Sequence, residues 1–226
     1  MAQGQKFSGW IKFEQLDVPL QNIESSFTIG YKFLDGESDD WTKRFSGFKD
    51  GEAAAVHGGI NLMMKIIPLL VTTLNLQPPQ IVFIPALSSN ETVADENGSM
   101  AKMAKACAEC AGTHFVLDAI RKEKHAPLHS RQRTSEKRKE ILDNANHRSE
   151  SINAEYVFIF DDLITRGETL SHTAQAILAA NKDIKIYGIA LGKNERHSYT
   201  GGKLTNGHIP PWWEELWDEG EKEYNS

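Results

Sequence analysis

The chain has 226 residues, of which 40% are apolar and 25% are charged, and its formal net charge at pH 7 is −6. This length allows one sizeable domain with a hydrophobic core, with or without appendages. The acidic balance argues against a protein that coats nucleic acid with its whole surface. Two cysteines cannot build a disulfide scaffold and the first residues lack the apolar run of a signal peptide, so we expect a cytoplasmic protein.

The N-terminal part of the chain predicts two strands. Residues 7–16 carry several large apolar side chains, and residues 27–34 alternate apolar and polar positions as a half-buried strand does. Pro19 and a polar run separate the two segments. We therefore expect residues 1–40 to form a small antiparallel β appendage.

Residues 35–50 are predicted to be mostly loop, and a helix is predicted to begin at Glu52. The apolar residues of this helix fall on one stripe, as expected for a helix packed against a core. They are Val56, Ile60, Met63, Met64 and Ile67. We expect no membrane span here, because Lys65 and Pro68 interrupt the apolar stretch.

Residues 80–84 predict a short apolar strand, which is followed by the small and polar residues of a loop over 85–90. A helix is predicted from Ser99 to about Ala111. It carries Cys107 and Cys110, which we interpret as buried or half-buried thiols, because a structural zinc site needs four ligands.

A basic segment follows the next predicted strand, residues 114–120. Between positions 121 and 139 two glutamates stand against eight basic residues: Arg121, Lys122, Lys124, Arg131, Arg133, Lys137, Arg138 and Lys139. Three interpretations remain open. The segment is a cationic lid over an anionic substrate, a patch for RNA or DNA, or a solvated helix that begins at Ser135.

The most informative stretch is residues 155–170, Glu-Tyr-Val-Phe-Ile-Phe-Asp-Asp-Leu-Ile-Thr-Arg-Gly-Glu-Thr-Leu. Residues 156–160 predict a strand that is buried on both faces. Asp161 and Asp162 follow at its carboxyl end, and a short loop leads into a helix. The apolar face of that helix is formed by Leu170, Ala174, Ile177 and Leu178.

This order of elements predicts an anion site. The free N–H groups of the loop and of the first helical turn point at one spot, and the helix dipole favours negative charge there. Gly167 permits close approach of the backbone, and the hydroxyls of Thr165 and Thr169 can donate to phosphate oxygens. Because Asp161 and Asp162 would repel the same phosphate, we expect them to bind sugar hydroxyls or a hydrated Mg²⁺.

The C-terminal part of the chain adds one more sheet strand, residues 184–191, and ends in an acidic, Trp-rich tail over 201–226. Between residues 214 and 223 there are six acidic residues and one lysine. Trp212, Trp213 and Trp217 are too apolar to remain in water, so we expect them to pack on the domain or on a partner subunit, which makes a homodimer one alternative.

The stretch from Asp161 to Thr169 resembles the ribose-phosphate signature of the type I phosphoribosyltransferases, in which two aspartates precede a Thr-Thr-Gly-x-Thr loop. Arg166 and Glu168 depart from that pattern. The residues before the first long helix, from Lys43 to Gly51, and the Ile84-Pro85 strand end are similar to the ComF-like branch of the family. So are Arg121, Gln132 and Arg138, whose spacing resembles its Arg…Gln…Arg pattern.

The resemblance implies an α/β, Rossmann-like phosphoribosyltransferase fold over residues 41–200, with a mostly parallel sheet and an N-terminal hood. It implies transfer of 5-phosphoribose from 5-phosphoribosyl-1-pyrophosphate (PRPP) to a nitrogenous acceptor, with Mg²⁺ as cofactor. Asp161 and Asp162 would be catalytic and would contact the metal through ribose or water. PRPP would be bound by Thr165, Arg166, Gly167, Glu168, Thr169, Ala86, Ser88, Ser89 and Arg121.

A non-catalytic protein of the same fold is the alternative function. Arg166 and Glu168 favour this alternative, as does the basic segment. Such a protein would sense PRPP or associate with nucleic acid. No membrane partner is expected.

Overall fold

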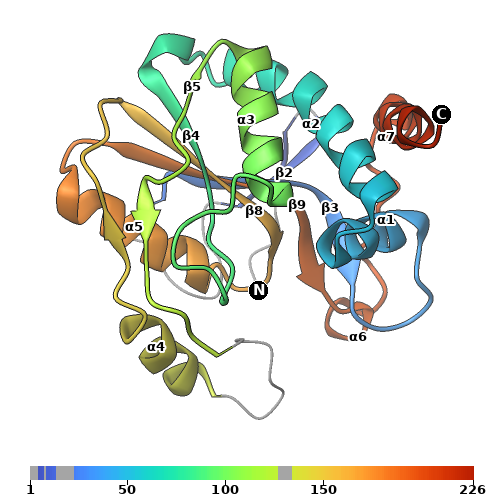
Figure 1. The fold of residues 1–226 in the computed structure, drawn as a ribbon. Coiled ribbons are helices and arrows are strands. Elements are labelled where there is room, and N and C mark those ends of the chain that lie inside the picture. Colours follow the sequence, from blue (N-terminus) through green and yellow to red (C-terminus); the bar gives the residue numbers. More distant parts are fainter. Residues whose placement is uncertain (1–4, 8, 14–22, 127–133) are drawn as a thin grey trace.

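The computed structural model describes residues 5–7, 9–13, 23–126 and 134–226. One sheet at its centre contains β1 (Gln5–Phe7), β2 (Trp10–Phe13), β3 (Ser25–Phe33), β4 (Ile81–Pro85), β5 (His114–Phe115), β8 (Tyr156–Ile164) and β9 (Lys185–Glu195). These seven strands lie in the order β1-β2-β3-β9-β8-β4-β5 (Figure 1). All neighbours from β3 to β5 are parallel, whereas β1 and β2 extend the sheet antiparallel. The predicted α/β class with a mostly parallel sheet is confirmed.

The N-terminal strands are an extension of the main sheet. β3 pairs with β2 on one side and runs parallel to β9 on the other, with Phe27 opposite Ile189. Phe27 and Ile29 are fully buried, and so are Ser26 and Thr28 on the opposite face. Because β3 pairs with β9, the described strands of the appendage expected over residues 1–40 continue the main sheet.

The prediction of a loop over residues 35–50 is wrong, because helix α1 occupies Asp40–Asp50. The carboxylate of Asp39 accepts a hydrogen bond from the amide of Thr42 at 2.7 Å, which caps the helix start. Trp41, Phe45 and Phe48 recur at helical spacing and are buried. Gly51 then ends the helix in the left-handed conformation, with φ of 77°.

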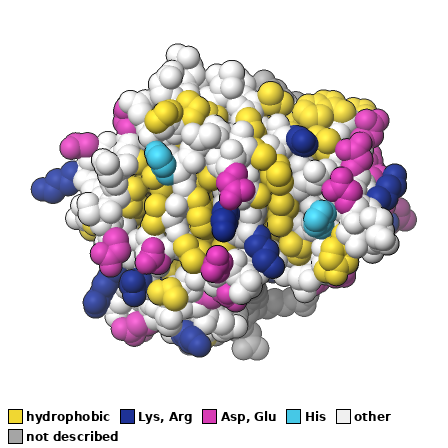
Figure 2. Space-filling view, turned by 45° about the horizontal axis from the view of Figure 1, so that its top comes forward, with side chains coloured by type: hydrophobic (Ala, Val, Ile, Leu, Met, Phe, Trp, Pro, Cys, Tyr) yellow, Lys and Arg dark blue, Asp and Glu magenta, His cyan; other side chains and the backbone are white. Residues whose placement is uncertain are grey.

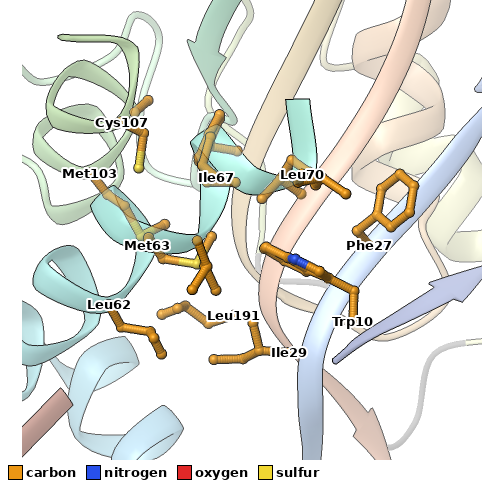
Figure 3. Packing of buried hydrophobic residues seen from close by; sticks show 14 of the residues in the cluster. Trp10, Phe27, Ile29, Leu62, Met63, Ile67, Leu70, Met103, Cys107 and Leu191 are labelled. Carbon is orange, nitrogen blue, oxygen red and sulfur yellow. The ribbon is translucent and has the colours of Figure 1, made fainter. Parts of the chain in front are cut away.

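Helices α2 (Ala53–Thr73) and α3 (Ser99–Ala111) cover one face of the sheet, and both were predicted. Figure 3 shows Met63 and Ile67 of α2 and Met103 and Cys107 of α3 packed toward strand residues such as Leu191. By length and composition α2 would suffice to cross a membrane, but half of that stretch is buried inside the protein. It is therefore a core helix.

Helix α5 (Glu168–Ala180) covers the opposite face. Its predicted stripe is confirmed, since Leu170, Ala174 and Ile177 are fully buried in a second hydrophobic cluster. The two clusters lie on opposite sides of β8, which contributes Phe158 to one and Ile159 to the other.

The predicted strand over residues 114–120 is divided. Only His114–Phe115 pairs with β4, and Ile120–Arg121 forms β6, which pairs with β7 (Arg148–Ser149) in a separate two-stranded sheet. Helix α4 (Ser135–Asp143) lies between β6 and β7 in sequence and contacts α5. We call β6, α4 and β7 the arm. The arm diverges from the main sheet because β6 pairs with β7 and does not continue along β4.

The C-terminal helix α7 (Pro211–Tyr224) packs on α2, after the short helix α6 (His197–Thr200). Trp213 and Trp217 are buried within the same chain, whereas Trp212 is 43% exposed. In Figure 2 acidic side chains gather at the right edge of the molecule, where Figure 1 places α7. The remaining element, the 3₁₀ turn η1 (Pro78–Gln80), leads into β4.

Candidate functional site

A cavity of about 420 Å³ lies where the connections of the sheet change direction. From β4 the chain passes through α3 to the edge strand β5, whereas from β8 it passes through α5 to β9 on the other side. The loops after β4 and β8 therefore separate at the carboxyl ends of these strands. In open α/β sheets this is the point where ligands bind.

Asp161 and Asp162 both line this cavity. They lie within β8 and not beyond its end, because β8 continues to Ile164 beside β9. The neighbouring strand β4 ends at Pro85, opposite Phe160. The acidic pair is thus the first part of β8 that has lost its β4 neighbour, which leaves both side chains beside open space.

The two carboxylates differ in their surroundings. The ammonium group of Lys49 lies 3.4 Å from one carboxylate oxygen of Asp162. The other carboxylate oxygen of Asp162 accepts a hydrogen bond from the amide of Leu163 at 2.6 Å. Asp161 accepts from the amide of Asp162 at 2.9 Å. Desolvation, followed by the charge of Asp162, holds the pKa of Asp161 well above its ordinary value, although the more distant Lys49 opposes the shift.

The loop after β4 forms a second wall. The amide of Ala86 donates to the carbonyl of Phe160 at 2.7 Å, which continues the strand pairing for one residue. Ala86, Ser88 and Ser89, the residues predicted to lie near pyrophosphate, all line the cavity. Their small side chains leave the backbone accessible. The start of α3, from Gly98 to Ala101, also lines the cavity.

Of the residues 165–169, which were predicted to bind phosphate, only one lines this cavity. Thr169 lines it, whereas Thr165, Arg166, Gly167 and Glu168 are not among its lining residues. Gly167 precedes α5 with φ of 78°, a left-handed conformation that favours glycine.

Two side chains of the segment 165–169, those of Thr165 and Glu168, are bound to other parts of the protein. The hydroxyl of Thr165 accepts a hydrogen bond from Asn194 at 2.7 Å. Glu168 pairs with Arg138 of the arm at 3.3 Å, and both side chains are largely buried. Arg138 thereby compensates the negative charge that Glu168 places at the start of α5.

Arg121 does not reach the cavity. Its guanidinium lies 3.7 Å from Glu150 and 3.8 Å from Asp118, on the exposed side of the arm. The expectation that Arg121 binds PRPP rested on the resemblance to the Arg…Gln…Arg pattern, whereas in the structure Arg121 belongs to β6, which pairs with β7 away from the main sheet. Gln132, Arg131 and Arg133 lie outside the residues that the structure describes.

Several lining residues were not identified from the sequence. Phe48 and Lys49 reach the cavity from α1, His125 reaches it from the segment after β6, and Glu91 and Asp95 come from the loop before α3. The basic and aromatic stretch from Lys43 to Gly51 was the one available signal for Phe48 and Lys49. Nothing in the local pattern marks the other three residues, which only the fold brings to the site.

The carboxylates suit an indirect role in metal binding. Oxygen ligands are those that Mg²⁺ prefers, and it usually takes one or two carboxylates together with substrate phosphates. Among the residues that the structure describes, no group of three or more His, Cys, Asp or Glu side chains converges on a metal position. Asp161 and Asp162 therefore fit contact through water or substrate, and no protein cage is present in the described part of the chain.

No family model matches the sequence, and no curated relative does. Among solved structures, the chain is similar to a hypoxanthine phosphoribosyltransferase from Staphylococcus aureus. The similarity covers 61% of this chain and 74% of that one, with 12% sequence identity and a TM-score of 0.35. At this distance the similarity assigns the chain to no family.

Proposed function

We propose that the cavity binds PRPP with Mg²⁺, and that the protein transfers 5-phosphoribose to a nitrogen nucleophile, with a nucleobase as the expected acceptor. One observation carries this proposal: Asp161 and Asp162, the small residues after β4 and Thr169 line one cavity at the switch point of the sheet. These are three of the parts that the resemblance implies, and the residues after β4 come from a segment far from the other two in the chain.

The proposed roles follow from position and charge. Asp161 and Asp162 bind the two ribose hydroxyls. Ser88 and Ser89 lie on the pyrophosphate side, and Thr169 with the start of α5 lies on the side of the 5-phosphate. In the reaction the bond between the anomeric carbon and pyrophosphate breaks, and its electron pair leaves with pyrophosphate. A bond forms between the anomeric carbon and the acceptor nitrogen. The carboxylate of Asp162 stabilises positive charge on the sugar in between.

The first experiment measures PRPP binding in the presence of Mg²⁺ by isothermal titration calorimetry. Asp161→Asn replaces a carboxyl oxygen by an amide nitrogen that cannot accept a hydrogen bond, so we expect the affinity for PRPP to fall on the order of a hundredfold, the effect of about one strong hydrogen bond. The matched control is Asp118→Asn, because Asp118 lies outside the cavity. Equal affinities of the wild type and Asp161→Asn would remove Asp161 from the binding site.

A second experiment distinguishes an enzyme from a non-catalytic binder. One observation favours the binder: residues 165–168, which the motif assigns to the phosphate, do not line the cavity. We expect release of pyrophosphate when PRPP is incubated with the correct member of a panel of nucleobases. Tight PRPP binding without turnover on any base would support a PRPP-sensing regulator.

A further inference from the structure

The loop after β4 already binds an anion, and that anion is one of its own side chains. A carboxylate oxygen of Glu91 accepts a hydrogen bond from the amide of Ser88 at 2.6 Å. Its other oxygen accepts from the amide of Asp95 at 3.3 Å. Ser88, Glu91 and Asp95 all line the cavity. The bond to Ser88 is short, as is usual when a carboxylate accepts.

The same loop is held in place from beneath by the segment after β6. Lys122 is 4% exposed, and its ammonium group donates to the carbonyl of Glu91 at 2.9 Å and approaches that of Ser89 at 3.4 Å. The amides of Lys122 and His125 donate to the carbonyls of Thr92 and Ser89, both at 3.0 Å. Because the loop backbone is fixed in this way, Glu91 can leave the Ser88 amide by rotating its side chain, without unfolding the loop.

Charge makes this contact consequential for a phosphorylated ligand. The cavity is lined by four carboxylates, those of Glu91, Asp95, Asp161 and Asp162, against the single ammonium group of Lys49 among the described lysines and arginines. A pyrophosphate group that enters the cavity would need the amide of Ser88 as a donor, and that amide is already bound to the negatively charged carboxylate of Glu91. Two anions cannot share one donor without strong repulsion in a partly desolvated site.

We propose that Glu91 is an internal competitor for the pyrophosphate group of the substrate, so that its charge sets the affinity and the release of that group. This proposal rests on the proposed function, because that function places pyrophosphate at Ser88. Substrate binding then requires the Glu91 carboxylate to move away from Ser88, and its return promotes departure of the pyrophosphate product.

The alternative is a purely local role, in which Glu91 closes a turn as in a capping box, Ser-x-x-Glu. The two roles are separable by Glu91→Gln. The amide oxygen of glutamine still accepts from Ser88, so the shorter of the two hydrogen bonds of the turn is kept, while the charge and the longer bond to the amide of Asp95 are lost. Glu96→Gln is the matched control, because Glu96 is in the same loop but is exposed and outside the cavity lining.

The experiment measures binding of inorganic pyrophosphate, with Mg²⁺, to the full chain by calorimetry. We expect Glu91→Gln to bind pyrophosphate about tenfold more tightly than the wild type, and Glu96→Gln to differ from it by less than about twofold. Equal affinities of Glu91→Gln and Glu96→Gln would assign Glu91 to the turn and overturn the proposal.

A measurement on the unaltered protein covers the case of a misfolded variant. Addition of pyrophosphate to the wild type should shift the amide resonance of Ser88 more than that of Asn97, whose amide is bound to Asp95 at 2.9 Å. An unmoved Ser88 resonance at saturation with pyrophosphate would overturn the competitor role. If PRPP still bound in that case, the proposed function would stand, whereas absence of binding by either ligand would overturn both.

Discussion

Asp161 is the residue at which binding and stability conflict. Its carboxylate faces a cavity between two strand ends and lies next to the charge of Asp162, so that ionisation is unfavourable in the folded protein. In the unfolded chain the same group ionises near its ordinary pKa. The site therefore retains an acidic group that the fold alone would not favour, as is common where residues are selected for binding.

Asp161→Asn should accordingly make the protein more stable at neutral pH. Since the folded-state pKa of Asp161 is raised, its contribution favours folding at pH values below the unfolded pKa and is lost as pH rises through the folded pKa. Urea unfolding should show a higher free energy of unfolding for Asp161→Asn than for the wild type at pH 7. The difference should disappear near pH 3, where the wild-type carboxyl is protonated in both states. A less stable variant at pH 7 would contradict the assigned pKa direction.

Among the elements, α7 shows how a polar C-terminal segment becomes part of the core. Trp217 is fully buried, its indole N–H donates to Glu221 at 2.7 Å, and its ring lies edge-on to Trp41 and Phe45 of α1. Gly58 of α2 allows this approach, because a methyl group there would lie 2.7 Å from the indole. The ion pairs of Arg44 with Glu214 and Asp218 fix α7 beside α1.

Trp217→Ala should destabilise the protein by about 3–5 kcal/mol, the usual range for deleting a buried aromatic side chain. Trp212 provides the matched comparison, because it lies in the same helix and is 43% exposed. Trp212→Ala should change stability by less than about 1 kcal/mol. The measurement is chemical denaturation of both variants, and similar losses of stability would contradict the packing of α7.

For the molecule as a whole, the arm is attached to the body of the protein by titratable groups. His147 follows α4, is largely buried, and lies with its ring 5.9 Å from that of His172 on α5. His172 in turn lies 3.8 Å from Asp143. Burial, then the charges of His172, Lys122 and His125, lower the pKa of His147 to about 4, while the nearby backbone of Leu142 opposes the shift.

The contribution of His147 to stability should therefore fall on acidification, opposite in sign to that of Asp161. Because the folded-state pKa of His147 lies below the ordinary value of 6.5, its contribution is complete above pH 6.5 and is lost as pH falls toward 4. His147→Leu should reduce this loss, as measured by urea unfolding at intervals between pH 7 and pH 4. His57→Gln serves as the control, since His57 is 48% exposed by its side chain. A wild-type pH profile that His147→Leu leaves unchanged would exclude His147 as the cause.

The elements with strong periodic patterns were predictable, and those that depend on a cap or on competition for partners were not. The strand at 156–160 and the buried face of α5 followed from apolar spacing. Helix α2 was predicted as well, but its buried face contains Leu62, Ile66 and Leu70, whereas Val56, Ile60 and Met64 of the predicted stripe are only partly buried. The prediction failed for α1, where a single cap at Asp39 and three aromatic residues outweigh a loop-like composition. It failed again over residues 114–120, where β7 competes for the backbone of β6.

The sequence alone was sufficient to identify an α/β protein and a strand–loop–helix motif with an acidic pair. The reason is that an apolar run typical of a buried strand and the apolar spacing of a helix are both formed by residues close together in the chain. The composition of the cavity was decided in three dimensions. Lys49, Glu91 and His125 meet Asp161 there because β4 ends beside β8 and because α1 and the segment after β6 close over the gap. Contacts between distant segments depend on which strands pair, and the residues of one strand do not specify which strand it pairs with.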